Sequence, residues 1–236
     1  LVIDIYQKKE EKKKESSLEA IRRRFREQKK RFFKPETPKE IPRKRVIRTV
    51  VIDPGHGGYE AGLIAENHKE KNVVLDIAKR LGSFISKGSK QTILTRKSDQ
   101  YMSLGERMKL ANSKDPDVFL SIHIGKHSGI VLYTPVVTEE VPYEKRKFLA
   151  NRGQKEYLMR TEALRDALRK AIIKDFGEDM VSEKPLRYSI LSDIEAAALL
   201  IELPSFEDAH YIPELNMELA NTLYKGLSMY EENTSY

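Results

Sequence analysis

From residue 46 onward, short apolar runs alternate with longer stretches of helical periodicity. The apolar runs predict strands at 46–53, 91–96, 117–124, 129–135, 186–191 and 197–203. Helical spacing predicts helices at 69–86, 103–112 and 207–231, and mostly helix over 138–177 with a break near 151–153. This alternation indicates an α/β fold, in which a single domain has a mostly parallel or mixed central sheet flanked by helices.

The segment before this domain has a different composition. Residues 8–48 hold 18 Lys and Arg against 7 Asp and Glu, a net charge of +11, whereas residues 49–236 carry −3. We therefore predict a basic helical or disordered linker over 8–45, which ends in a proline-rich stretch, and a globular domain over 46–236. The alternative role of the basic run is an electrostatic tether to anionic polymers or lipid headgroups.

The composition also limits the chemistry. The chain has no cysteine, so disulfides, cysteine-based zinc sites and thiol nucleophiles are excluded, and a metal site must use His and carboxylates. No apolar run approaches the ~20 residues of a transmembrane helix. Because the positive charge lies outside the domain, no nucleic-acid partner is expected; a DNA-binding role would require salt-dependent binding by residues 1–48 alone.

Four polar residues occupy positions where a strand ends or a helix begins. His56 lies in the glycine-rich turn after the first strand, and His123 lies near the end of an apolar strand. Glu202 follows five apolar residues in the last strand, and Glu70 opens the first helix. Because the carboxyl ends of parallel strands meet at one edge of a sheet, these side chains are expected to converge there.

Each of these residues also has an ordinary structural interpretation. A turn histidine can bond to the backbone, a core histidine can be hydrogen-bonded, and an acid in a first helical turn complements the helix dipole. A carboxylate after an apolar run, as at Glu202, is costly unless it is paired, metal-bound or used chemically. Two histidines and a carboxylate form a known catalytic zinc ligand set, and a further glutamate beside the water is the usual general base.

Five segments in a fixed order carry a resemblance to a known family. They are VVIDPGHGG (50–58), KEKNVVLDIAKRL (69–81), ILTRKSDQYMSLGERMKLAN (93–112), DVFLSIH (117–123) and ALLIELPSF (198–206). Over about residues 48–231 the sequence resembles the zinc-dependent N-acetylmuramoyl-L-alanine amidases of the Amidase_3 type, which act in cell separation and cell-wall lysis.

The resemblance implies hydrolysis of the amide bond between N-acetylmuramic acid and L-alanine in peptidoglycan. It places one Zn²⁺ per chain on His56, Glu70 and His123, with Glu202 as general base on a zinc-bound water. Arg96 and Arg107 match family positions. They are candidates for substrate binding, with a structural salt-bridge role as the alternative.

The region after the third ligand departs from the family pattern. His127 follows in a predicted loop, and it either contacts substrate or has no function. The family usually continues after the SIH motif with a small residue and Asn, whereas this chain has Ile124 and Gly125. The run after the catalytic glutamate also differs, at 203–210. These departures are expected to affect the substrate groove rather than the chemistry.

Features outside the motifs extend the comparison. Residues 1–7 resemble the last strand of an AMIN-type wall-targeting domain. The implied location is periplasmic or extracellular, at the cell wall, with a signal peptide outside this sequence. The stretch 138–177 is either an ordinary covering helix or an inhibitory insertion that an activator protein moves.

The alternatives for the whole domain are an inactive or self-inhibited peptidoglycan-binding module and a zinc peptidase of another specificity. His68 is a rival metal ligand.

Overall fold

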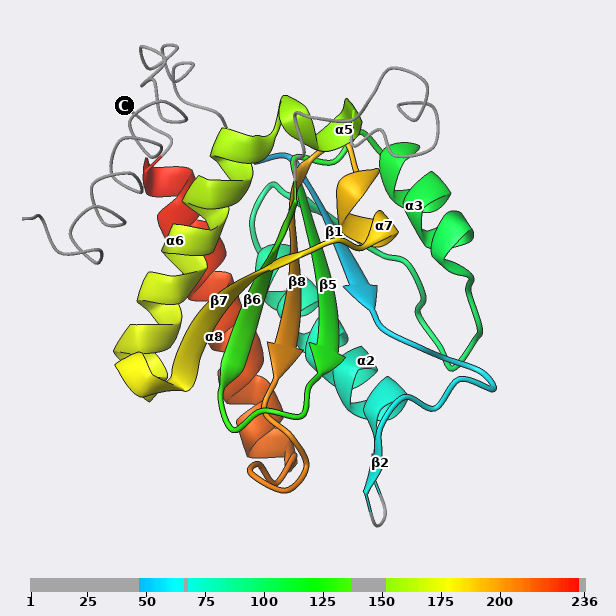
Figure 1. Cartoon of the computed structure of the whole chain (residues 1–236), viewed down its shortest axis with the longest axis vertical. Helices are drawn as coiled ribbons and strands as arrows, with labels where there is room; N and C mark the ends of the chain where they lie inside the picture. The colour runs from blue at the N-terminus through cyan, green and yellow to red at the C-terminus, as the bar shows by residue number, and fades with distance from the viewer. Residues whose placement is uncertain (1–46, 66–67, 137–151, 234–236) are drawn as a thin grey trace, which may run out of the picture. The chain divides into compact units, whose positions relative to one another are not determined.

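The computed structural model describes residues 47–65, 68–136 and 152–233 (Figure 1). These residues belong to one compact unit, which spans Arg43–Tyr236. The AMIN-like segment 1–7 and the linker 8–45 lie outside the described residues, so their roles stay predictions. Among the described helices, none is both long and apolar enough to span a membrane.

A six-stranded sheet forms the centre of the domain, with the strand order β4-β1-β5-β8-β6-β7 (Figure 1). Its strands are β1 (Thr49–Pro54), β4 (Gln91–Leu94), β5 (Val118–Ile124), β6 (Ile130–Pro135), β7 (Val181–Leu186) and β8 (Ala197–Leu203). The neighbouring strands β4, β1, β5 and β8 are parallel, whereas β6 runs antiparallel to β8 and β7 runs parallel to β6. The prediction of a mostly parallel or mixed sheet is confirmed.

Helices cover both faces of this sheet. They are α2 (Glu70–Ile85), α3 (Leu104–Asn112), α5 (Arg152–Lys155), α6 (Leu158–Phe176), α7 (Ser189–Ser192) and α8 (Pro213–Asn233). Because successive strand residues point to opposite faces, Val50 and Ile52 pack in the core under α2, α6 and α8, whereas Val51 packs in the core under α3 and α7. The sheet is therefore buried on both sides.

Several helix boundaries follow from local chemistry. The side chain of Ser103 accepts a hydrogen bond from the backbone of Glu106, whose carboxylate bonds back to Ser103, so the predicted capping box is present at the start of α3. The last helix begins at Pro213, later than the predicted residue 207, because proline is favoured in the first helical turn, where its missing N–H has no helical partner.

The predicted strand at 186–191 is wrong. The strand β7 ends at Leu186, and residues 189–192 form the short helix α7, which buries both Ile190 and Leu191. β7 has the polar sequence VSEKPL because it is the edge strand of the sheet, where one side faces no neighbouring strand and Pro185 is tolerated. The two-stranded ribbon of β2 (Ile64–Ala65) and β3 (His68–Lys69) was not predicted either.

The contact between α6 and α8 depends on a glycine. A Cβ atom added at Gly226 would lie 2.9 Å from the Cα of Leu168, a backbone atom that cannot easily move away. We expect Gly226→Ala to lower the free energy of unfolding by about 1–3 kcal/mol through overpacking. Gly105→Ala in α3 is the matched control, because nothing lies within 4 Å of its added Cβ, and it should raise stability by up to about 1 kcal/mol. Urea denaturation measures the free energy of unfolding of both variants. An equal gain in stability in the two would contradict the close packing at Gly226.

Candidate active site

Three neighbouring parallel strands bring the predicted site residues to one edge of the sheet. The strands β1, β5 and β8 lie side by side, so their carboxyl ends meet there (Figure 1). His56 follows β1, His123 lies in β5 and Glu202 lies in β8. His123 and Glu202 are direct register partners, and this pairing fixes their side chains next to each other on the sheet.

The turn after β1 holds His56 in an uncommon backbone conformation. His56 has a φ of 58°, in the left-handed region, and the next two residues, Gly57 and Gly58, have φ values of 128° and 59°. Consecutive positive φ angles are accessible mainly to glycine, which explains the two glycines after His56. The turn directs His56 back toward the helix that begins at Glu70.

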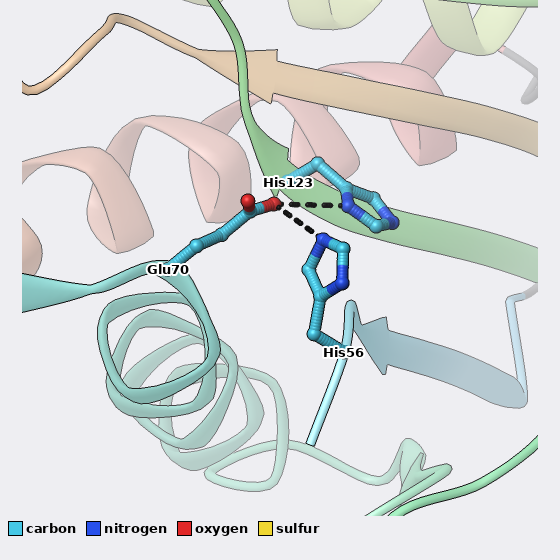
Figure 2. A group of neighbouring side chains, drawn as sticks. All are labelled: His56, Glu70 and His123. Carbon is cyan, nitrogen blue, oxygen red and sulfur yellow. Dashed lines mark hydrogen bonds and ion pairs between the residues drawn. The ribbon is translucent and has the colours of Figure 1, made fainter. Parts of the chain in front are cut away.

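Three side chains from different elements converge on one point. Figure 2 shows the carboxylate of Glu70, from the start of α2, facing both His56 and His123. Its Oε1 atom lies 3.1 Å from Nε2 of His56 and 3.0 Å from Nδ1 of His123. The donor atoms of the three residues all lie within 4.8 Å of one another, a spacing that allows them to hold one metal ion. The rival ligand His68 is exposed in β3 and lies outside this group.

The carboxylate of Glu70 is fixed from every side. It is only 2% exposed, and its oxygens accept hydrogen bonds from the backbone N–H groups of Leu63 (2.8 Å) and Ile124 (3.0 Å). Burial alone would raise the pKa of Glu70, but the hydrogen bonds to His123, His56 and Leu63 outweigh it and hold the pKa well below the usual value. Glu70 is therefore an ionised carboxylate held in place, and its oxygens are available as metal ligands.

Two glycines leave the room that this group needs. A Cβ atom at Gly55 would collide with the ring of His123, and one at Gly62 would collide with Glu70 and lie 2.7 Å from Cδ2 of His56. The cradle around the group is thus shaped for these three side chains. Its donor set of two imidazoles and one carboxylate is also the set that suits Zn²⁺, so the residues present fit a zinc ion.

A buried ion pair lies beneath the turn that carries His56. Asp53, at the end of β1, is fully buried and accepts hydrogen bonds from Arg107 Nη1 (2.8 Å), Thr95 Oγ1 (2.6 Å) and Ser121 Oγ (2.9 Å). Arg107 is 3% exposed. A buried carboxylate with three donors is satisfied, whereas the same carboxylate without them would be costly.

Arg96 and Arg107 also bind the backbone of this turn. Arg107 donates to the carbonyl oxygens of Pro54 (2.8 Å) and His56 (2.7 Å), and Arg96 donates to those of Pro54 (2.9 Å) and Gly55 (2.7 Å). Arg96 is 1% exposed. Arg107 thus forms a salt bridge, as its structural interpretation expects, while Arg96 contacts backbone carbonyl oxygens; a role of either arginine in substrate binding stays a prediction.

The carboxylate of Glu202 lies in a separate set of contacts. Its Oε2 accepts a hydrogen bond from the hydroxyl of Tyr133 at 2.9 Å and lies 3.3 Å from Nε2 of His127. Burial and the bond to Glu202 raise the pKa of Tyr133 to about 12, so its hydroxyl stays protonated at neutral pH. A Cβ at Gly125 would lie 2.8 Å from this Oε2 and 3.1 Å from the ring of His127, so a larger residue here would displace the Glu202 carboxylate.

Two cavities meet at the histidine pair. Both are lined by His56 and His123. One, of about 490 Å³, extends over Glu70, Lys126, His127, Tyr133 and Glu202. The other, of about 460 Å³, extends over Glu60, Tyr101, Met102, Leu104, Tyr188 and Ile190. The two histidines of the metal-capable group therefore border both cavities.

Comparison with known proteins identifies the family. Residues 50–228 match the Amidase_3 family model, described as N-acetylmuramoyl-L-alanine amidase. The chain belongs to this amidase family. The match covers the sheet, α2 and the whole group of site residues.

Individual relatives agree with this assignment. The chain is 32% identical to the endolysin of Bacillus phage SPP1 over 156 residues, which are 66% of this chain and 54% of the endolysin. It is 44% identical to the N-acetylmuramoyl-L-alanine amidase AmiA of Escherichia coli over 77 residues, which are 32% of this chain and 27% of AmiA. The chain thus spans about half or less of the length of these relatives.

Solved amidase structures share the fold. An N-acetylmuramoyl-L-alanine amidase from Clostridium difficile 630 matches with a TM-score of 0.65 and 25% identity, over 79% of this chain and 97% of that one. The catalytic domain of CwlV from Bacillus (Paenibacillus) polymyxa matches with a TM-score of 0.63 at 20% identity, over 79% and 99% of the two chains. The α/β fold inferred from the sequence is confirmed.

Some residues of the site were not found from the sequence. Asp53 carries the same signal as Glu202, a carboxylate that ends an apolar strand, and it could have been identified in this way. Tyr133 gave no comparable signal, because a tyrosine in a half-buried strand is ordinary. The need for glycine at Gly62 depends on its close approach to Glu70 and His56, which only the structure reveals.

The contacts of Arg107 predict how a conservative substitution behaves. In Arg107→Lys, one ammonium group cannot replace the fork that reaches Asp53, Pro54 and His56, so we expect a loss of roughly 2–3 kcal/mol in unfolding free energy. Arg80→Lys, at the more exposed pair with Asp76, should change it by less than about 1 kcal/mol. Thermal and urea unfolding provide the comparison. A normally stable Arg107→Lys protein with weakened substrate binding would instead favour the substrate-contact interpretation.

Proposed function

We propose that this chain is a zinc-dependent hydrolase that cleaves the amide bond between N-acetylmuramic acid and L-alanine in peptidoglycan. The observation that carries the proposal is the convergence of His56, Glu70 and His123 on one point, with Glu202 in register beside His123. Membership of the amidase family supports the substrate class.

His56, Glu70 and His123 would hold the zinc ion. When bound, zinc supplies Lewis-acid polarisation of the scissile carbonyl and lowers the pKa of water from 15.7 to roughly 7. Glu70 contributes the negative charge of the ligand set, and its two backbone hydrogen bonds keep it in place. The hydrogen bond from Arg107 to the His56 carbonyl keeps the turn, and with it the imidazole, in one orientation.

Glu202 is the proposed general base. It accepts the proton of the attacking water at its carboxylate and returns that proton to the departing alanine nitrogen, so the water oxygen ends on the lactyl carbonyl and the amine leaves neutral. Tyr133 donates to Oε2 of Glu202 and fixes its orientation. His127, 3.3 Å from the same oxygen, is a second orienting contact and borders the cavity where substrate would lie.

The finer features implied by the family are also proposals. An activator protein acting on 138–177 is one; α6 accounts for residues 158–176, and 137–151 lie outside the described residues. The CwlD amidase of Clostridioides difficile, which has a similar fold, was solved in complex with the GerS lipoprotein. That complex is a precedent for a bound partner. A periplasmic or cell-wall location follows from the proposed substrate.

Zinc binding provides the first test. The full chain should bind one Zn²⁺, and His123→Ala should abolish stoichiometric binding because only two ligands remain. His68→Ala is the matched control, since His68 lies near α2 but outside the ligand group, and it should keep the zinc. Elemental analysis after dialysis measures the metal content. Stoichiometric zinc in His123→Ala would contradict the ligand set.

The rate of hydrolysis distinguishes the general base from the metal ligands. Glu202→Gln should keep one zinc per chain but lose about 10²–10⁴-fold in rate, because the amide cannot accept the proton. Glu207→Gln, at an exposed position just beyond β8, is the control and should stay active. The measurement is the appearance of new alanine amino termini on purified peptidoglycan. A fully active Glu202→Gln protein would remove Glu202 from the mechanism, and release of other amino termini would indicate a peptidase.

A further inference from the structure

Two tyrosine rings form an exposed platform next to the candidate active site. Tyr59 and Tyr101 stack with their ring centroids 4.3 Å apart and their planes 26° from parallel. Tyr59 is 77% exposed and Tyr101 is 39% exposed. Their stacking buries little of Tyr59, so the stability of the fold does not explain an aromatic residue at this position. A solvent-facing aromatic pair at the rim of a cavity is typical of a binding surface.

The backbone beneath the platform is rigid. The N–H of Gly58 donates to Asp99 Oδ1 at 2.8 Å, and Lys71 Nζ donates both to the Gly58 carbonyl (2.7 Å) and to Asp99 Oδ2 (2.6 Å). A Cβ added at Gly58 would lie 2.8 Å from the backbone nitrogen of Tyr101, so the two tyrosine segments pack against each other directly. A ligand that stacks on these rings therefore meets a preformed surface and does not have to order it.

The platform continues into the cavity that contains the metal-capable group. Tyr101 lines the 460 Å³ cavity together with His56 and His123, and the other walls include Leu104, Tyr188 and Ile190. This arm also includes the exposed Glu60 and the buried ion pair of Asp53 and Arg107, so its accessible charge is a carboxylate.

The second cavity has a different character. The 490 Å³ cavity on the other side of the same histidines is lined by Lys126 and His127 and by the polar groups of Tyr133 and Glu202. The two arms therefore differ in their accessible charge. One carries the exposed Lys126, which suits a ligand carboxylate, whereas the other carries tyrosines and the exposed carboxylate of Glu60, which suit an uncharged ligand.

We propose that Tyr59 and Tyr101 bind the glycan strand of the substrate by stacking under the apolar C–H face of an N-acetylated pyranose ring. The inference rests on the proposed function, because the bond cleaved there joins an uncharged sugar polymer to a peptide that bears carboxylates. The sugar matches the aromatic arm, and the carboxylates match Lys126 in the other arm. The platform thus sets the direction in which the substrate crosses the centre.

The direct test is binding of a peptide-free sugar. The full chain carrying Glu202→Gln is titrated with tetra-N-acetylchitotetraose, and tyrosine fluorescence, which no tryptophan masks in this sequence, reports contact. Tyr59→Leu should weaken binding about tenfold, whereas Tyr59→Phe, which keeps the ring, should bind like the parent. Met159→Ala removes an exposed apolar side chain from α6, outside both cavities, and should have no effect.

A kinetic comparison supplies the second readout. The ratio of kcat/KM for a tetrasaccharide muropeptide to that for a single-sugar muramyl peptide should fall about tenfold in Tyr59→Leu. Parent-like sugar binding by Tyr59→Leu, or an unchanged ratio, would overturn the proposal. If the Glu202→Gln chain binds the sugar through Tyr59 but the unmodified chain has no amidase activity, the platform stands and the proposed function is rejected. If the unmodified chain hydrolyses the substrate without a Tyr59 effect, the proposed function stands and the platform is rejected.

Discussion

The ion pair between Asp53 and Arg107 joins the end of β1 to α3 in the interior of the domain. Both side chains are almost completely buried, and such a pair is tolerated only when its remaining hydrogen-bonding groups are satisfied. Thr95 and Ser121 complete the shell of Asp53, and backbone carbonyls of the following turn complete that of Arg107. Satisfying the buried charges therefore fixes the turn, and the turn fixes His56.

The parallel register of the sheet also fixes the positions of the other site residues. His123 and Glu202 are far apart in the sequence but are held side by side by the hydrogen bonds of two central strands. Glu70 joins them from the first turn of α2, where Leu63 and Ile124 bind its carboxylate. Groups placed by strands and helix starts, with bonded neighbours, are positioned more accurately than groups on loops. This explains why the proposed chemistry is located here.

The same distinction explains what could be predicted from the sequence. Strand ends, the capping box at Ser103 and the four chemical residues have local signals, and the structure brings those four residues to one edge as expected. The strand β7 gave the wrong signal because an edge strand is polar and α7 is apolar. The partnership of Tyr59 with Tyr101 depends on contacts across 42 positions, for which no local pattern exists.

On the proposed function, loops beside the sheet edge decide which substrate it acts on. The family departure at Gly125 is one example, because a Cβ here would press on the Glu202 carboxylate and on the ring of His127, so a larger residue would displace the contact between them. The turn after His56 is the other, because its glycines bring Tyr59 onto Tyr101 beside the same centre. On the proposed function, the loop at Gly125 orients the general base on the peptide side of the substrate, and the turn after His56 binds the sugar. The metal-capable group and Glu202, which lie between the two loops, can then keep a single reaction. Substitutions in either loop change which peptidoglycan strands are cut.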